Sequence, residues 1–290
     1  MSELTTHVLD APGARLYYDI RASDIRTNAR TSLLLLGSPM GAAGFGTLAG
    51  HFDDRTVVTY DPRGSERSVR TDGAATDTPD EHADDLRRLI ETLEVGPVDI
   101  FASSGGAVNA LALISRHPGL VRTLVAHEPP ATQQLPDRGP ALAACRDIHR
   151  TYLRDGYGPA MAKFITLVSH QGEFPPDFAE RAAPNPAQFG LPEADDGSRG
   201  DPLLGRNIVS CNQYVHDVEA LRTASAHLVL GVGAASGDTL AARAPVALSR
   251  KLDITPTPFP GDHVGFLGGE YGMTGVPDAF SGALRQVLDD

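Results

Sequence analysis

Cysteine is scarce in this chain, and its two cysteines stand alone. Cys145 and Cys211 are the only ones among 290 residues, and neither belongs to a Cys-x-x-Cys pair. Paired spacing is typical of metal and redox sites, whereas small secreted proteins carry larger cysteine frameworks. We therefore expect two buried free thiols in a cytoplasmic protein, rather than a disulfide or a metal site.

Basic charge and long apolar runs are also in short supply. The sequence has 25 Lys and Arg residues against 37 Asp and Glu, a formal net charge of −12. Such a protein repels phosphate groups, so neither nucleic acid nor an anionic membrane is expected as a partner. The apolar run Leu33–Leu36 is far shorter than the roughly 20 residues that span a bilayer. The first ten residues lack the basic and apolar parts of a signal peptide, and none is expected.

Cofactor motifs are missing as well. We find no metal-ligand cluster and no phosphate-binding loop, and the glycine-rich segment Gly231–Gly237 lacks the Gly-x-Gly-x-x-Gly spacing of a dinucleotide site. We expect neither a cofactor nor a metal. The expected partner is a small-molecule substrate, bound by a monomer or a homodimer.

What the sequence does contain is a regular alternation of short apolar segments and helical segments. The expected strands are Thr5–Asp10, Arg15–Ile20, Ser32–Leu36, Thr56–Asp61, a segment that begins at Val98, Thr123–His127, His227–Val232 and Ile254–Phe259. The expected helices are Ala42–His51, a helix that Thr78 caps and that ends near Leu93, Gly105–His117, Leu240–Leu252 and Pro277–Leu288. Continuously apolar strands between helices of this length indicate an α/β fold with a mostly parallel sheet, covered on both faces.

The alternation stops at Glu128-Pro129-Pro130 and returns at His227. Between these points only helices are expected, interrupted by a stretch rich in proline and glycine. We therefore predict an α/β core made of residues 1–130 and 224–290, with a helical cap or lid formed by residues 131–223.

The most informative stretch surrounds Ser104. A short apolar strand leads into a tight turn and then a helix, with small residues two before and two after the serine, Ala102 and Gly106. This spacing is required when a serine occupies a strained strand-to-helix turn, the nucleophile elbow. Choosing Ser103 instead would put the bulky Phe101 two residues before the serine. An ordinary glycine-serine turn into a helix remains the alternative.

With these residues in place, the chain resembles the α/β-hydrolase fold superfamily over nearly its whole length. Four features in register carry the resemblance: the segment Leu33–Gly41, the segment Tyr60–Ser68 with its Asp-Pro-Arg-Gly sequence, the Ser104 turn, and Pro260–His263. The resemblance implies an eight-stranded sheet with helices on both faces and a helical cap after the sixth strand. It also implies a serine nucleophile, a histidine base, an acidic residue that orients the base, and an oxyanion hole of backbone N–H groups.

The base is expected to be His263, on the loop after the last strand, because ligands of open α/β sheets gather at the carboxyl ends of the strands. The histidines on expected helices are interpreted as surface residues: His51, His82, His117 and His149. The resemblance places the oxyanion donors at the N–H groups of Gly105 and Ser38, with Leu36 in place of the usual histidine.

The sequence offers two candidates for the acidic residue of the site. Most of the superfamily has an aspartate in a Gly-x-x-Asp turn after the seventh strand, but this chain has Ser236 there and Asp238 two residues later. A subset of the superfamily takes the acid from the end of the sixth strand, where Glu128 stands. We favour Glu128 and keep Asp238 as the alternative. In the turn after Thr56–Asp61, Asp61 and Arg63 are expected to form an ion pair.

These expectations favour a serine hydrolase that cleaves a small or medium carboxylic ester, lactone or thioester through an acyl-enzyme. A cofactor-free haloperoxidase or perhydrolase, or a carbon–carbon bond hydrolase, would use the same three residues. A non-catalytic ligand-binding protein on a hydrolase scaffold is the alternative from another class, since a fold does not imply a function.

Overall fold

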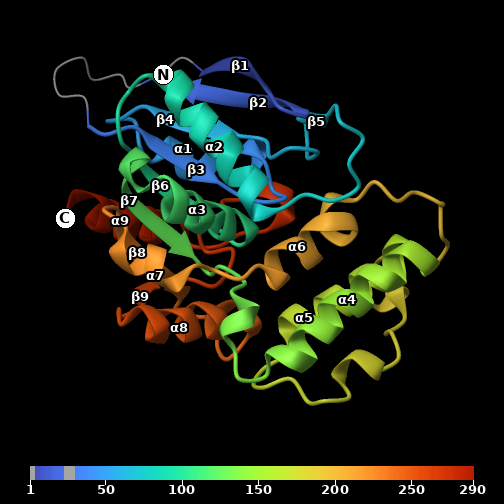
Figure 1. The fold of residues 1–290 in the computed structure, drawn as a ribbon. Coiled ribbons are helices and arrows are strands. Elements are labelled where there is room, and N and C mark those ends of the chain that lie inside the picture. Colours follow the sequence, from blue (N-terminus) through green and yellow to red (C-terminus); the bar gives the residue numbers. More distant parts are fainter. Residues whose placement is uncertain (1–3, 23–29) are drawn as a thin grey trace.

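The computed structural model describes residues 4–22 and 30–290. The expectation that no signal peptide is present rests on the first ten residues and so lies partly outside them. Within the described chain, one mixed sheet carries helices on both faces, and a group of helices lies to one side of it (Figure 1). This confirms the predicted α/β class.

The sheet contains nine strands in the described part of the chain. They are β1 (Leu4–Ala11), β2 (Ala14–Arg21), β3 (Leu33–Leu36), β4 (Val57–Tyr60), β5 (Val69–Arg70), β6 (Val98–Ser103), β7 (Val121–His127), β8 (His227–Gly233) and β9 (Thr257–Phe259). Their order is β1-β2-β4-β3-β6-β7-β8-β9, with β5 paired to β2. The pairs that involve β2 are antiparallel, and all pairs from β4 to β9 are parallel. The two-residue β5 was not predicted, because its residues lie in a polar loop without an apolar run.

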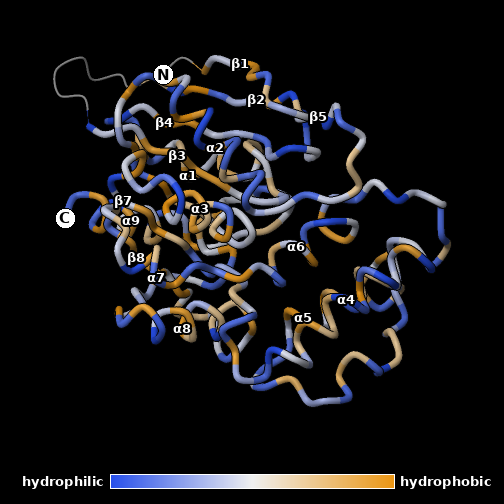
Figure 2. Tube along the Cα trace, viewed as in Figure 1, coloured by the Kyte–Doolittle hydropathy of each residue, from blue (hydrophilic) through white to orange (hydrophobic). Residues whose placement is uncertain are grey.

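The helices of the core are α1 (Gly46–Gly50), α2 (Pro79–Leu93), α3 (Gly105–Arg116), α8 (Leu240–Leu252) and α9 (Pro277–Asp289), with the 3-10 turn η1 (Ala42–Phe45) before α1. Side chains of β3 show how they cover the sheet. Leu34 and Leu36 belong to a buried cluster with α2, α3 and α8, whereas Leu33 and Leu35 belong to a second cluster with α1 and α9. The central strands are therefore apolar at every position because both of their faces are buried. Figure 2 shows this apolar centre in orange.

Helices and turns of helix are the regular elements of residues 131–223, which we call the inserted segment; the stretch between Ser169 and Leu203 is mostly irregular. The regular elements are α4 (Arg138–Asp155), α5 (Tyr157–Ser169), the π-helix η6 (Leu203–Asn207), α6 (Ile208–Gln213) and α7 (Val218–Thr223), besides short 3-10 turns. In Figure 1, α4 and α5 lie apart from the sheet, and α6 lies between them and the core. The division of the chain into a core and a cap domain stays a prediction.

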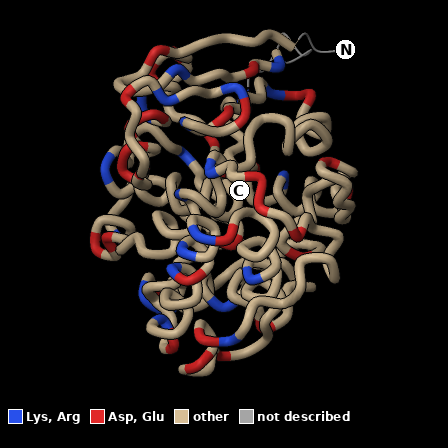
Figure 3. Tube along the Cα trace, turned by 90° about the vertical axis from the view of Figure 1, so that its right-hand side faces the viewer, with Lys and Arg blue, Asp and Glu red and all other residues tan. Residues whose placement is uncertain are grey.

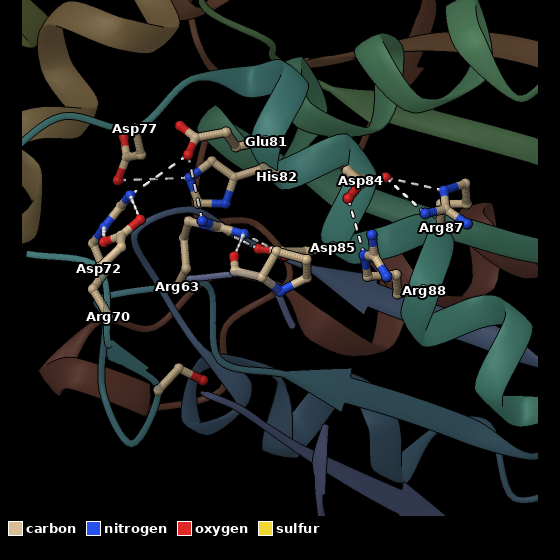
Figure 4. Close-up of polar contacts among 12 residues, drawn as sticks. Arg63, Arg70, Asp72, Asp77, Glu81, His82, Asp84, Asp85, Arg87 and Arg88 are labelled. Carbon is tan, nitrogen blue, oxygen red and sulfur yellow. Dashed lines mark hydrogen bonds and ion pairs between the residues drawn. The ribbon is translucent and has the colours of Figure 1, made fainter. Parts of the chain in front are cut away.

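The loop after β4 is fixed differently from the prediction. Asp61 accepts hydrogen bonds from the Ala42 N–H (2.8 Å) and from Arg67 (2.5 Å), not from Arg63. Arg63 instead binds both carboxylate oxygens of Asp85 on α2, at 2.6 and 2.7 Å (Figure 4). The predicted Asp61–Arg63 pair is therefore wrong. Arg63 reaches past its own turn and pairs with the carboxylate of Asp85, which is fully buried.

One of the predicted surface histidines is also buried. His82 on α2 is 3% exposed and faces Asp77, with Nε2 and Oδ2 3.7 Å apart (Figure 4). The inserted segment covers this end of α2, since Arg206 and Ser210 both contact Asp77. A helical pattern read locally cannot show that a distant segment will cover it.

Charges of both signs are intermixed on the face shown in Figure 3. Cys145 and Cys211 are buried free thiols, as predicted, and burial raises the pKa of each to about 12. Among the described helices, none combines the length and the apolar character needed to cross a membrane.

Candidate active site

Ser104 occupies a strained corner between β6 and α3. Its φ of 57° and ψ of −128° lie where a residue with a side chain is rarely found. The corner is held by its backbone: the Ser104 N–H donates to the His127 carbonyl (3.0 Å), and the Ser104 carbonyl accepts from the Ala107 N–H (3.0 Å). Ser104 itself is half-buried. This is the backbone conformation that the small-x-Ser-x-small spacing predicted.

The two glycines after Ser104 allow a close approach to the turn after β3. A Cβ on Gly105 would lie 2.4 Å from the Ser38 carbonyl oxygen, and one on Gly106 would lie 2.6 Å from the Leu36 carbonyl oxygen. No side chain fits at such distances unless the backbone moves. The start of α3 therefore packs directly against this turn, and the two expected oxyanion donors, Ser38 and Gly105, are neighbours.

The register of the sheet brings the other expected site residues to the same place. In the parallel pair β6–β7, Ser103 is opposite His127. Ser104 and Glu128 each follow by one residue, so they leave adjacent strands at the same edge. Since β9 is parallel to β8 and ends shortly before His263, the loop that carries His263 leaves the sheet at this edge too.

Glu128 and His263 form a hydrogen-bonded pair. Nδ1 of His263 lies 2.7 Å from Oε2 of Glu128, and the Gly233 N–H donates to Oε1 at 2.8 Å. The Glu128 side chain is fully buried, whereas 40% of the His263 side chain is exposed. Burial disfavours the charged carboxylate, but the hydrogen bond from His263 and the interactions with the His127 and His263 rings together outweigh it and hold the pKa of Glu128 at about 2. An ionised Glu128 can only accept in this bond, so Nδ1 of His263 carries the hydrogen, and Nε2 is the ring nitrogen left to take up a proton.

Comparisons with known proteins identify the family of the chain. A family model described as the alpha/beta hydrolase fold matches residues 34–183, more than half of the chain. The chain belongs to the alpha/beta hydrolase fold family. An uncharacterised hydrolase of Bacillus subtilis, YraK, is 28% identical over 263 residues, which cover 89% of each chain.

Solved structures of other alpha/beta hydrolases superpose on nearly the whole chain. One is from work on carboxylesterases of the archaeon Nitrososphaera gargenis, with a TM-score of 0.66, 18% identity, and coverage of 98% of this chain and all of the other. Another is a proline iminopeptidase of Mycobacterium smegmatis, with a TM-score of 0.64, 18% identity, and coverage of 98% of both chains. At this identity the similarity shows the fold and does not identify a substrate.

Asp238, the alternative acid of this alpha/beta hydrolase, forms no hydrogen bond or ion pair with His263 in the described part of the chain. Its side chain is 68% exposed, and its carboxylate is 3.8 Å from Nε of Arg243 on α8. The Asp238 N–H donates to the Gln171 side chain. The structure thus brings Glu128 to His263 and leaves Asp238 at the surface.

Two residues near the site were not predicted to belong to it. Ser236, which stands where most members of the superfamily are expected to have the aspartate, is buried beside the site, and its hydroxyl has no hydrogen-bond partner among the described residues. The Gly-x-x-Ser sequence was a usable signal for it. Asn207 of the inserted segment donates to the Ser38 hydroxyl at 2.9 Å. Nothing in the sequence distinguishes this asparagine from an ordinary residue of a helix.

His127 lies beneath the pair. It is fully buried and packs among phenylalanine rings, and its ring centroid is 6.2 Å from that of His263. Neither ring nitrogen has a hydrogen-bond partner among the described residues. Burial lowers the pKa of His127 to about 4, so the ring is neutral near pH 7.

Proposed function

We propose that this alpha/beta hydrolase is a serine hydrolase that cleaves a small or medium carboxylic ester, lactone or thioester through an acyl-enzyme. The observation that carries the proposal is the Glu128–His263 hydrogen bond at the sheet edge where the strained Ser104 turn also lies. A serine hydroxyl is a poor nucleophile unless a base accepts its proton. Nε2 of His263 is the basic nitrogen available for this.

The proposed reaction follows from these groups. The Ser104 oxygen attacks the carbonyl carbon as its proton passes to Nε2 of His263, and Glu128 stabilises the imidazolium that forms. The N–H groups of Ser38 and Gly105 stabilise the negative charge that develops on the carbonyl oxygen. Collapse of the intermediate expels the alcohol or thiol, which takes the proton from His263. Water then attacks the acyl carbon as its proton passes to His263; the bond to the Ser104 oxygen breaks, Ser104 takes the proton back from His263, and the carboxylic acid leaves.

Replacing Ser104 by alanine tests the proposal. We expect Ser104→Ala to lose hydrolysis of p-nitrophenyl acetate and butyrate by at least about 10³-fold, and to lose labelling by a fluorophosphonate probe. Ser103→Ala is the matched control, because Ser103 is the last residue of β6 and comes before the strained turn. This variant should keep both the ester hydrolysis and the labelling by the probe. A Ser104→Ala variant that still hydrolyses these esters would reject the nucleophile, and a wild-type chain that is never labelled would favour the ligand-binding alternative.

The same residues would serve a perhydrolase, a cofactor-free haloperoxidase or a carbon–carbon bond hydrolase. Assays with hydrogen peroxide as the acyl acceptor, with and without halide, separate the first two from simple hydrolysis. A panel of esters, lactones and amides of graded acyl length identifies the preferred substrate. A cytoplasmic location and a monomeric or homodimeric state stay predictions.

A further inference from the structure

A short stretch of the inserted segment lies over the carboxyl edge of the sheet. The π-helix η6 runs directly into α6, which lies between the core and the outer helices (Figure 1). Two neighbouring side chains of η6 bond to different loops of the core. Arg206 donates to the Gly64 carbonyl (2.6 Å) in the loop after β4, and Asn207 donates to the Ser38 hydroxyl (2.9 Å) in the turn after β3.

The Asn207 carboxamide lies between the two expected oxyanion donors. Asn207 is 8% exposed, and its Nδ2 contacts Oγ of Ser38 at 2.9 Å and Sγ of Cys211 at 3.3 Å. A Cβ on Gly105 would lie 3.0 Å from Nδ2 and 3.1 Å from Oδ1 of the same carboxamide. One side chain from the inserted segment therefore touches Ser38 and sits against the helix start that contains Gly105.

The position of Ser38 matters because an oxyanion donor works only when its N–H points at the developing charge. Removal of one such donor typically costs about 10²–10³ in rate. A hydrogen bond to the Ser38 hydroxyl restrains the side chain, and with it the peptide group that the same residue presents. The contact is buried, so water cannot easily replace it without a change of the packing around it.

We propose that Asn207 is a positioning residue: through the Ser38 hydroxyl, it holds the turn after β3 in the orientation that the oxyanion hole needs. The inference rests on the proposed serine hydrolase function. Its consequence is that the inserted segment takes part in catalysis as well as covering the site.

Three variants test this inference in the full-length protein with p-nitrophenyl butyrate. We expect Asn207→Ala and Ser38→Ala each to lower kcat about 10- to 100-fold, with KM changed by no more than about threefold, because the lost interaction acts in the transition state. In the double variant the loss should match the larger single loss within about twofold, since the two side chains act through one hydrogen bond. Fluorophosphonate labelling of Ser104 should slow in parallel.

Asn207→Asp separates positioning from simple support of the fold. The aspartate has the same shape, and it can accept a hydrogen bond from the Ser38 hydroxyl in place of the one that Asn207 donates, so a purely structural role predicts a milder effect than that of alanine. Next to an oxyanion hole, its negative charge opposes the developing charge, and we expect kcat about tenfold below that of Asn207→Ala. Tyr214→Phe is the matched control, because it removes another hydrogen bond between the inserted segment and the core, to Asp80 at 2.8 Å. It should keep the wild-type kcat.

Additive losses in the double variant, or an unchanged kcat in Asn207→Ala, would overturn the inference. If Asn207→Ala does not fold, as judged by circular dichroism, then Ser38→Ala decides the outcome: a kcat within about twofold of the wild type overturns the inference, and a loss of about 10- to 100-fold with little change in KM supports it. Failure of the probe to label wild-type Ser104 is a different result. It would remove the proposed function, and this inference with it.

Discussion

Glu128 combines two features that each raise the free energy of the folded protein. Its φ is 48°, in the left-handed region, and its carboxylate is fully buried. Such strain and burial persist only when the surroundings hold the residue in place, and here the Gly233 N–H and His263 do so. This arrangement orients the imidazole for proton transfer if Ser104 is the nucleophile.

Two amide substitutions test the role of the acid. We expect Glu128→Gln to lower kcat for ester hydrolysis by about 10²–10⁴-fold, because the neutral amide neither stabilises the imidazolium nor fixes the correct tautomer. Asp238→Asn, the matched control, should stay within about twofold of the wild type, since Asp238 is exposed and lies against Arg243 rather than pairing with His263. Steady-state kinetics of both variants decides between them. A larger loss in Asp238→Asn would reject Glu128.

His127 makes stability depend on pH. Its pKa is about 4 in the folded protein, below the usual 6.5. Between pH 4 and pH 6.5 the unfolded chain therefore binds a proton at His127 that the folded protein does not bind. Stability therefore falls as the pH drops from 6.5 towards 4, by roughly 2 kcal/mol between pH 7 and 4.5. We expect His127→Leu to remove this fall and to cost little at pH 7, because the ring nitrogens lack partners among the described residues. Urea denaturation at pH 7 and 4.5 measures both values. An unchanged fall would contradict the assignment.

For single residues, the sequence predicted the site where local backbone geometry permits only certain residue types. The elbow at Ser104 could be predicted because only small residues fit two positions away from it. Glu128 could be favoured because it stands at the end of a strand. Asn207 and the burial of His82 could not be predicted, because both depend on where a distant inserted segment comes to rest.

At the level of elements, α2 illustrates how a local signal fixes a boundary. Thr78 accepts from the Glu81 N–H (3.2 Å), and the Glu81 carboxylate accepts from the Thr78 N–H (2.9 Å), a complete capping box. The helix begins at Pro79, as the sequence predicted. Strand ends were less certain: the last strand was expected from Ile254 but begins at Thr257, because apolar character alone does not show where pairing with β8 starts.

Thr78→Ala tests the capping box. We expect it to lower the free energy of unfolding by about 1 kcal/mol, because the Glu81 N–H in the first turn loses its acceptor, the Thr78 hydroxyl. Thr92→Ala, near the exposed end of the same helix, is the control. Thr92 donates only to the Arg88 carbonyl within the helix, and alanine has the higher helix propensity, so stability should be unchanged or slightly higher. Equal losses in the two variants, measured by urea denaturation, would contradict the capping argument.

For the whole molecule, the buried core runs through both predicted domains. One continuous cluster includes Leu34 and Leu111 of the core together with Ile148 and Leu167 of the inserted segment. We therefore expect scanning calorimetry to show one cooperative transition, because the inserted segment cannot unfold without exposing core side chains. Two resolved transitions would mean that residues 131–223 unfold independently.

An ion pair between the core and the inserted segment provides a second test of the single unfolding transition. Arg243 on α8 binds Asp137 at the start of α4 through two contacts, at 2.6 and 3.1 Å, and both side chains are nearly buried. Arg243→Met leaves the Asp137 carboxylate without its cation, and we expect about 3 kcal/mol of destabilisation. The whole transition should shift to lower temperature. A variant in which only part of the heat absorption shifts would show that the two regions are not coupled.

The carboxylate that meets His263 stands one residue beyond β7, while the turn after β8 contributes a serine. A genome survey that requires an aspartate in the turn after β8 would class such a chain as a hydrolase without a complete site. If Glu128 proves essential, a survey pattern should also accept an acidic residue directly after the strand beside the nucleophile. Such a pattern would keep a chain in which a glutamate after that strand replaces the aspartate of the later turn.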